Sequence, residues 1–200
     1  IRTLKDFARE FPTVGLRLNV GSLGSIVDQV IKGDADIGIG GVPGEAEDVR
    51  LIEIGLVTMV PVASPSHPLA RLKGPVPLEE LREHTQLVVT DPSQRTRGRD
   101  FSVFAFRTWR LTDMHTKHLM IRAGLGWGGL PRWIIADDLR KGLLVELDLE
   151  PFGQAQGPFY AMHRIDRAPG PAASWLIDTV KSQLGCFNEA APDGILPGPP

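Results

Sequence analysis

Residues 11–41 read FPTVGLRLNVGSLGSIVDQVIKGDADIGIGG, and this stretch decides how the chain folds. Apolar side chains alternate at Leu16, Leu18 and Val20, as they do on one face of a β-strand. A second apolar run, rich in glycine, follows at residues 37–40. The residues between the two runs are enough for one short helix, so the stretch predicts a strand–helix–strand unit.

The predicted helix of this unit begins at Ser22, whose hydroxyl suits the N-cap position. Gly33 stands where a helix end favours a left-handed residue. We therefore expect a helix N-terminus beside the carboxyl end of a parallel sheet, which is where open α/β sheets bind ligands. The apolar side chains of the helix recur with helical spacing at Leu23, Ile26, Val27, Val30 and Ile31.

Composition indicates a foldable globular chain. Of its 200 residues 42% are hydrophobic, and the formal net charge of −2 argues against direct nucleic-acid binding by this segment. No apolar run approaches the roughly 18 residues that a membrane span needs, and no signal peptide is visible. The single Cys186 excludes an internal disulfide and fits a reducing compartment, so we expect a cytoplasmic protein without a membrane partner.

The rest of the chain shows further α/β units. The patterns predict helices at residues 4–11, 78–81, 112–124, 131–142 and 172–184. They predict strands at residues 86–90, 101–111, 127–130, 143–147 and 159–163, and residues 51–64 carry two apolar runs, of which residues 56–63 are the better strand. Because strands and helices alternate, we expect parallel sheets with helices on both faces. Pro61 favours an edge or a crossing position for the strand that contains it.

These units group into two predicted lobes with a cleft between them. Lobe I holds residues 1–63 together with residues 165–186, and lobe II holds residues 64–164. Residues 187–200 contain too few apolar side chains to fold, and they are predicted to be a disordered tail.

Several short motifs follow one another in a fixed order. Phe11-Pro12 precedes a V-x-L-x-L-x-x-G pattern at residues 14–21, and G-x-x-D-x-x-I follows at residues 33–39. Two later elements are PVASPSHPLA at residues 61–70 and AGLGWGGLP at residues 123–131. Together these motifs resemble the regulatory domain of LysR-type transcriptional regulators, and the resemblance extends over residues 1–184.

The resemblance implies a type-two periplasmic-binding-protein-like fold, in which two α/β lobes are joined by a two-segment hinge around a central cleft. It also implies a bacterial transcription regulator that senses a small metabolite, forms a homodimer or homotetramer, and has neither enzymatic activity nor a cofactor. The chain starts at Ile1 without an initiator methionine, so we expect it to be cut from a longer protein. A winged helix-turn-helix domain would precede it and would make all of the DNA contacts.

Two other classes of protein share this fold. A periplasmic solute-binding protein of a transporter is the main alternative, and it would require a cleaved secretory signal upstream. An enzyme ranks last, because the sequence contains no G-x-S-x-G elbow, phosphate-binding loop or C-x-x-C motif.

Two residues of lobe I are predicted to contact the effector. Ser22 offers its hydroxyl and the N–H groups of a helix start, which suit an anion, so we expect the effector to be anionic. Simple N-capping is the alternative role for Ser22. Gly41 ends the neighbouring strand at the same edge, and a plain turn is its alternative.

Lobe II supplies the other candidate contacts. Thr90 ends a strand, and Thr112 offers a hydroxyl at a helix start that Asp113 is expected to cap. In the glycine-rich element that follows, the backbone is predicted to line the cleft while Trp127 forms its wall. Filling of the core is the alternative role for this tryptophan. The candidate residues of this element are Trp127, Gly128, Leu130 and Pro131.

Two charged or metal-binding patterns are interpreted as solvated surface. Arg95, Arg97 and Arg99 alternate in a loop, with an anion gate or a subunit contact as the alternative. His115 and His118 lie one helical turn apart, but no cysteine or carboxylate is placed to complete a metal site. We therefore predict no bound metal.

Overall fold

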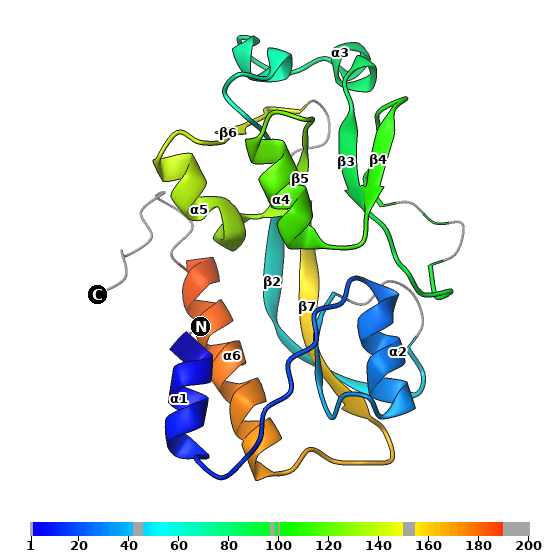
Figure 1. The fold of residues 1–200 in the computed structure, drawn as a ribbon, viewed down its shortest axis with the longest axis vertical. Helices are drawn as coiled ribbons and strands as arrows, with labels where there is room; N and C mark the ends of the chain where they lie inside the picture. Colours follow the sequence, from blue (N-terminus) through cyan, green and yellow to red (C-terminus); the bar gives the residue numbers. More distant parts are fainter. Residues whose placement is uncertain (1, 42–45, 97–98, 100, 150–154, 190–200) are drawn as a thin grey trace. The chain divides into compact units, whose positions relative to one another are not determined.

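The computed structural model describes residues 2–41, 46–96, 99, 101–149 and 155–189 (Figure 1). Its helices are α1 (Arg2–Glu10), α2 (Gly24–Lys32), the 3-10 helix η1 (Pro68–Arg71), α3 (Leu78–Glu83), α4 (Met114–Arg122), α5 (Arg132–Arg140) and α6 (Pro171–Glu189). Its strands are β1 (Gly38–Gly40), β2 (Val49–Ala63), β3 (Gln86–Val89), β4 (Thr108–Leu111), β5 (Gly128–Pro131), β6 (Val145–Glu146) and β7 (Ala155–Arg164).

The strands form two sheets. The five-stranded sheet has the order β1-β7-β2-β5, with β6 also paired to β2, and a two-stranded sheet holds β3 and β4. The β1–β7, β2–β5 and β2–β6 pairs are antiparallel, and only the β3–β4 pair among these is parallel. The predicted parallel sheets are therefore wrong for most pairings, because the long returning strand β7 takes the place beside β1.

The described chain separates into two compact units. The first unit draws on residues 1–56, 93–95 and 158–200, and the second on residues 57–92 and 96–157. Both changes of unit in the long strands fall inside β2 and β7, whereas the predicted boundaries fall after residues 63 and 164. The strand that contains Pro61 thus contributes residues to both units, as the crossing alternative for this strand expects.

In the first unit, helices α1 and α6 pack side by side (Figure 1). The ring centroids of Phe7 and Phe11 lie 6.0 and 5.7 Å from that of Trp175. Thr3 Oγ1 donates a hydrogen bond of 2.5 Å to the Gln183 side chain. The predicted N-terminal helix is confirmed, and these contacts fix it against the C-terminal helix.

The two faces of the first unit's sheet are covered by different helices. Met162 of β7 packs in one buried cluster with Val27 and Val30 of α2. Its neighbour Ala161 packs in another cluster with Ile177 of α6. Because successive side chains of a strand point to opposite faces, α2 and α6 lie on opposite sides of the sheet.

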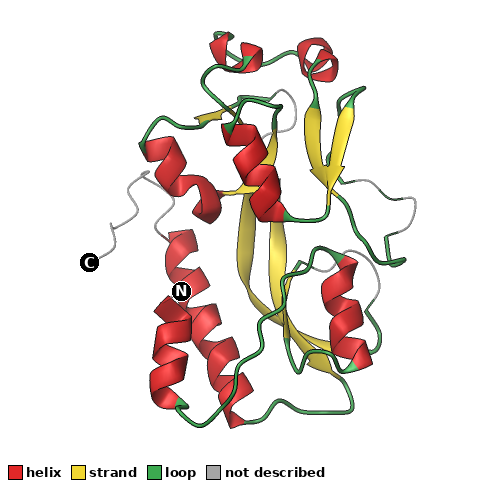
Figure 2. Ribbon diagram, viewed as in Figure 1, coloured by secondary structure: helices red, strands yellow, loops and turns green. Residues whose placement is uncertain are grey.

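The strand predicted at residues 16–20 does not form, and this prediction is wrong. The segment is an irregular connection between α1 and α2 (Figure 2). Leu18 and Val20 are 68% and 82% exposed, and no described strand pairs with this segment. A strand needs a neighbour for its backbone N–H and C=O groups, so alternation of apolar residues alone does not create one.

The end of the chain also departs from the prediction. Helix α6 continues to Glu189, so Cys186 lies within the helix rather than beyond it, and residues 187–189 are helical. The rest of the predicted tail, residues 190–200, lies outside the described residues. Within the part of the chain that the structure describes, no helix is long and apolar enough to cross a membrane.

In the second unit, two buried clusters flank the β2–β5 pair. One contains Val60, Leu130 and Ile135, and the other contains Leu69, Leu81 and Trp127. The predicted strand at residues 101–111 is reduced to β4, because residues 101–107 have no strand partner among the described strands.

Candidate functional site

The helix start in the first unit differs in detail from the prediction. Leu23, not Ser22, is the N-cap residue of α2, and its φ of 52° makes a sharp turn immediately before the helix. Ser22 is buried, and its backbone N–H donates to Ser25 Oγ over 3.0 Å. Ser25 Oγ in turn donates to the Ser22 carbonyl oxygen over 2.7 Å. The prediction that Ser22 is the N-cap is therefore wrong, and the hydroxyl of Ser25 makes both of these contacts.

The rest of this helix follows the sequence pattern. Gly33 has a φ of 77°, and its N–H closes the helix by bonding to carbonyls at Gln29 and Val30, as predicted. The first turn of α2 carries no acidic side chain. Gln29 Nε2 donates to the Ser25 carbonyl over 3.4 Å, which places an amide group beside the serine pair.

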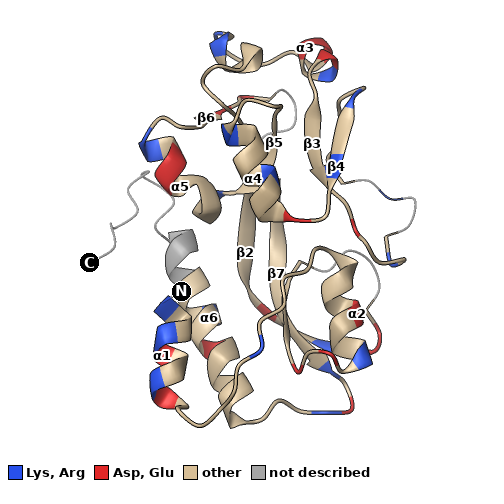
Figure 3. Ribbon diagram, in the orientation of Figure 1, with Lys and Arg blue, Asp and Glu red and all other residues tan. Residues whose placement is uncertain are grey.

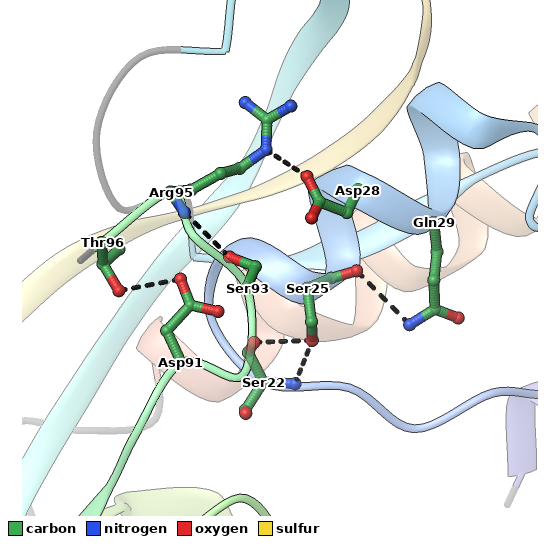
Figure 4. Close-up of polar contacts among 8 residues, drawn as sticks. All are labelled: Ser22, Ser25, Asp28, Gln29, Asp91, Ser93, Arg95 and Thr96. Carbon is green, nitrogen blue, oxygen red and sulfur yellow. Dashed lines mark hydrogen bonds and ion pairs between the residues drawn. The ribbon is translucent and has the colours of Figure 1, made fainter.

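An ion pair joins α2 to a distant loop residue (Figure 4). Arg95 Nε lies 2.6 Å from Asp28 Oδ1, and the two side chains are 26% and 28% exposed. Arg95 is preceded by Ser93, whose Oγ accepts the Arg95 backbone N–H over 3.2 Å. The interpretation of Arg95 as solvated surface is therefore wrong.

Nothing in the sequence reveals this pair, because its residues are 67 positions apart. Of the other two arginines, Arg99 is exposed and Arg97 lies outside the described residues. Asp28 follows Ser25 by one helical turn, so the ion pair lies on the same helix as this serine.

Gly41 follows the last residue of β1 and is partly exposed. A Cβ at this position would meet no atom within 4 Å, so the residue does not need to be glycine for packing. In contrast, a Cβ on Gly40 would lie 2.8 Å from Ile26 Cδ1. The structure thus packs the end of β1 against α2, the helix that follows Ser22.

In the second unit, Thr90 is occupied by local contacts. Its backbone N–H and its hydroxyl both donate to the Leu111 carbonyl, over 2.7 and 3.2 Å. Thr96 Oγ1 donates to Asp91 Oδ2 over 2.8 Å (Figure 4). These bonds order the end of β3 and the start of the following loop.

Trp127 fills the core of the second unit. Its side chain is 1% exposed and packs with Leu69 and Leu81. Its Nε1 donates to the His84 carbonyl over 3.3 Å, and its backbone carbonyl accepts from Leu87 over 2.8 Å. The structure therefore assigns this indole the core-filling role that was the alternative to a ligand wall.

The residues after Trp127 are equally enclosed. Gly128, Leu130 and Pro131 are buried, and Leu130 and Pro131 stand opposite Val60 and Met59 of β2. A Cβ on Gly128 would lie 2.8 Å from the Leu87 carbonyl oxygen. Close strand packing accounts for this glycine without a ligand.

Helix α4 begins as predicted. Asp113 is its N-cap, and its carboxylate accepts the N–H groups of His115 and Thr116 over 3.2 and 2.7 Å. Hydrogen bonds from Thr116 are the main reason why the pKa of Asp113 is lowered. Thr112 is exposed beside this cap.

The same helix contains two buried basic side chains that the sequence pattern does not reveal. Lys117 is 6% exposed, and its Nζ donates to the Gly129 carbonyl over 2.7 Å. Burial lowers the pKa of Lys117 to about 8. His118 is also buried and pairs with Asp138 of α5, with Arg122 Nε 3.6 Å from the same carboxylate.

The prediction of a solvated histidine face is therefore wrong for His118, whereas His115 is exposed. The described residues contain no cluster of three or more histidine, cysteine or acidic side chains that could hold a metal. The polar groups of Ser25 and Gln29, which are partly accessible, remain as candidates for a small ligand beside the buried Ser22.

Comparison with known proteins agrees with this architecture. A family model described as the LysR substrate binding domain matches residues 1–185. The HTH-type transcriptional regulator CbbR of Cereibacter sphaeroides is 25% identical over 197 residues, which cover 96% of this chain and 63% of that protein. The RuBisCO operon transcriptional regulator of Allochromatium vinosum is 27% identical over 188 residues, which cover 91% of this chain and 61% of that protein.

This chain therefore spans less than two thirds of the length of these relatives. Among solved structures, the CcmR regulatory domain of Synechocystis PCC6803 in complex with 2-PG matches with a TM-score of 0.71 at 19% identity. That match covers 92% of this chain and 89% of the CcmR chain. The fold is the type-two periplasmic-binding-protein-like fold of such regulatory domains, and the chain belongs to the LysR substrate binding domain family.

Proposed function

We propose that this chain is the effector-sensing and oligomerisation part of a bacterial LysR-type transcription regulator that works in the cytoplasm as a homodimer or homotetramer. The family model that matches residues 1–185 is the observation that carries this proposal. The two relatives reported above are transcription regulators, which favours a regulator over a solute-binding protein or an enzyme. DNA is bound through a separate domain of the longer protein, and this segment has a net charge of only −2.

The effector is a small anionic metabolite that binds at the start of α2. Ser22 and Ser25 supply polar groups there, and the first turn lacks a carboxylate that would repel an anion. Arg95, from a loop, pairs with Asp28 of the same helix and offsets the charge of that carboxylate. Gly41 supplies backbone at the end of β1.

In the second unit, residues Trp127, Gly128, Leu130 and Pro131 are enclosed, so their backbone is what they can contribute. Thr112 offers an exposed hydroxyl, and the Thr90 hydroxyl can contribute only in exchange for its bond to the Leu111 carbonyl. The effector acts by binding one arrangement of the protein more tightly than another. The difference in affinity shifts the population of those arrangements and so changes the spacing of the DNA-binding domains.

A thermal-shift panel of carboxylates, phosphorylated metabolites, neutral sugars and amines tests the ligand class. An anion at about 100 times its dissociation constant should stabilise the chain by about 2.7 kcal/mol. Stabilisation by neutral or cationic compounds alone contradicts the anionic assignment.

The helix start is tested with Ser25→Ala, which removes both hydrogen bonds to Ser22. The matched control is Ser174→Ala, because Ser174 also lies at a helix start in the first unit and bonds only weakly, to the Pro169 carbonyl over 3.4 Å. We expect the affinity for the stabilising anion to be roughly tenfold weaker in the Ser25 variant, a loss of about 1.4 kcal/mol. The affinity of the control variant should be unchanged. Equal affinities in both variants would place the effector elsewhere.

A further inference from the structure

The ion pair between Asp28 and Arg95 lies on the helix whose start is proposed to bind the effector. The charged residues of α2 are Asp28 and Lys32, and the first turn of the helix is uncharged (Figure 3). Arg95 Nε lies 2.6 Å from Asp28 Oδ1. Residues 93–95 belong to the first unit, as α2 does, so the pair lies within one unit. A carboxylate of α2 therefore contacts a cation that comes from a distant part of the sequence.

Ser25, Asp28 and Gln29 share one face of α2. Asp28 and Gln29 follow Ser25 by three and four residues, and side chains at these spacings are neighbours on a helix. An anion bound at Ser25 therefore lies about one helical turn, roughly 5 Å along the helix axis, from the Asp28 carboxylate. At that separation two negative charges repel each other, so the anion needs the cation that Asp28 already contacts.

An ordered turn presents Arg95 to the helix (Figure 4). Thr96 Oγ1 donates to Asp91 Oδ2 over 2.8 Å, and Ser93 Oγ accepts the Arg95 backbone N–H over 3.2 Å. The Arg95 side chain reaches Asp28 through Nε, and Figure 4 shows its two terminal nitrogens pointing away from that carboxylate. Arginine binds carboxylate and phosphate groups most strongly through two parallel N–H donors. The position of Arg95 thus suits an anion at least as well as it suits Asp28.

The ion pair is weak enough for a ligand to compete with it. Both side chains are partly exposed, and ion pairs of such exposure contribute little to stability and are screened by salt. Asp28 can also part from Arg95 at low cost, because water solvates a carboxylate that remains partly exposed. A deeply buried pair would not allow this exchange, since it would leave an uncompensated buried charge.

We propose that Asp28 is an internal competitor of the effector: it holds Arg95 in the ligand-free protein, and the anionic group of the effector takes over this arginine on binding. Asp28 thereby lowers the affinity of the site and raises the effector concentration at which the regulator responds. The carboxylate is needed neither for folding nor for binding, and it sets the threshold of the response. This inference rests on the proposed function, because it concerns the regulation of the same anion site.

The two members of the pair should change anion affinity in opposite directions. Asp28→Asn removes the competing charge about one turn from the site, so the affinity should rise by about 3- to 10-fold. Arg95→Gln removes the cation and leaves the carboxylate uncompensated, so the affinity should fall by about 10-fold or more. If the pair acted only by ordering the loop, the two substitutions would break the same bond and would change the affinity in the same direction.

Titration calorimetry with inorganic phosphate at low ionic strength measures these affinities in the 200-residue chain and its variants. Asp34→Asn is the matched control, because Asp34 is exposed beyond the opposite end of α2 and its substitution removes the same charge. The control should change the phosphate affinity by less than about 2-fold, since solvent and salt screen a charge at that distance. Raising the salt concentration should also reduce the gain of the Asp28 variant.

Three outcomes overturn the role of Asp28: no phosphate binding by any of the proteins, equal affinities of the unmodified protein and the Asp28 variant, or a loss of affinity in both the Asp28 and the Arg95 variants. A gain that the Asp34 control shares would also overturn it, because net charge alone would then explain the effect. The thermal-shift panel judges the proposed function separately. A metabolite anion that stabilises the unmodified protein and the Asp28 variant equally supports the anionic effector and contradicts only its competition with Asp28.

Discussion

The start of α2 and the segment from Trp127 to Pro131 are both predicted to contact an effector, yet they differ in exposure and in packing. At the start of α2, the Ser25 hydroxyl bonds to the backbone of Ser22, and the Gln29 side-chain amide donates to the Ser25 carbonyl. Ser25 and Gln29 are partly exposed. In the other segment the tryptophan is 1% exposed, and strand partners hold its backbone. The first region can exchange its local bonds for bonds to a ligand, whereas the second is fixed by packing.

The largest effect is expected from truncating Trp127, the packed residue in this comparison. Trp127→Ala should lower the free energy of unfolding by about 3 to 5 kcal/mol, because it leaves a large cavity beside Leu69 and Leu81. Urea denaturation measures this change. The neighbouring Leu125→Ala should cost less than about 0.5 kcal/mol, since that side chain is largely exposed. Similar losses for the two variants would show that Trp127 is not a core residue.

Lys117→Met tests how the buried ammonium group of Lys117, which bonds to Gly129 of β5, affects stability. The pKa of Lys117 is about 8 in the folded protein and 10.5 ordinarily, so the buried ammonium disfavours folding at neutral pH. The variant should be more stable at pH 7 by on the order of 2 kcal/mol, after allowance for the lost bond to the Gly129 carbonyl.

The stability difference between the unmodified protein and the Met variant should depend on pH. Between pH 8 and pH 10.5 the unfolded chain keeps a proton on Lys117 that the folded protein has lost, so the unmodified protein gains stability as the pH rises. The Met variant lacks this gain, and the difference between the two proteins should shrink across that window. Chemical denaturation at pH 7, 8.5 and 10 measures it, and a constant difference would contradict the assignment.

Ser25→Ala tests the hydrogen bonds at the start of α2. It removes the acceptor for the Ser22 N–H and the donor to the Ser22 carbonyl, so the free energy of unfolding should fall by about 1 kcal/mol. Ser25→Thr keeps the hydroxyl and should recover most of the loss. If alanine and threonine behave alike in urea denaturation, the hydroxyl does not order the helix start.

The smallest effect is expected at the Asp28–Arg95 pair. Both side chains are more than a quarter exposed, so a double-mutant cycle with Asp28→Asn and Arg95→Gln should give a coupling energy below about 1 kcal/mol. High salt should reduce it further. A coupling several times larger, or one that is insensitive to salt, would mean that the pair is more enclosed than the structure shows.

The sequence pattern was sufficient where local chemistry decides the outcome. Gly33 ends α2 in the left-handed conformation, and Asp113 caps α4, because each role depends on neighbours within four residues. The alternation at residues 16–20 predicts a strand face, but the segment forms no strand. No described strand lies beside it, and pairing is a property of the sheet rather than of one segment.

Long-range contacts explain the other differences. His118 has the spacing of a surface histidine, but α5 brings Asp138 against it from 20 positions away. Trp127 stands among glycines that suggest an open ligand wall, yet these glycines allow close strand packing at Thr85 and Leu87. No local signal distinguishes a tight core from an accessible site in such cases.

The order in which the first unit's parts are synthesised has a consequence for folding in the cell. Gly38 pairs with Met162, and Thr3 bonds to Gln183, so the earliest segments need partners that leave the ribosome last. The second unit, by contrast, draws nearly all of its residues from one continuous stretch, 57–157. Translation therefore delivers a complete second unit while α1, α2 and β1 still wait, and their apolar faces remain available to chaperones until α6 emerges.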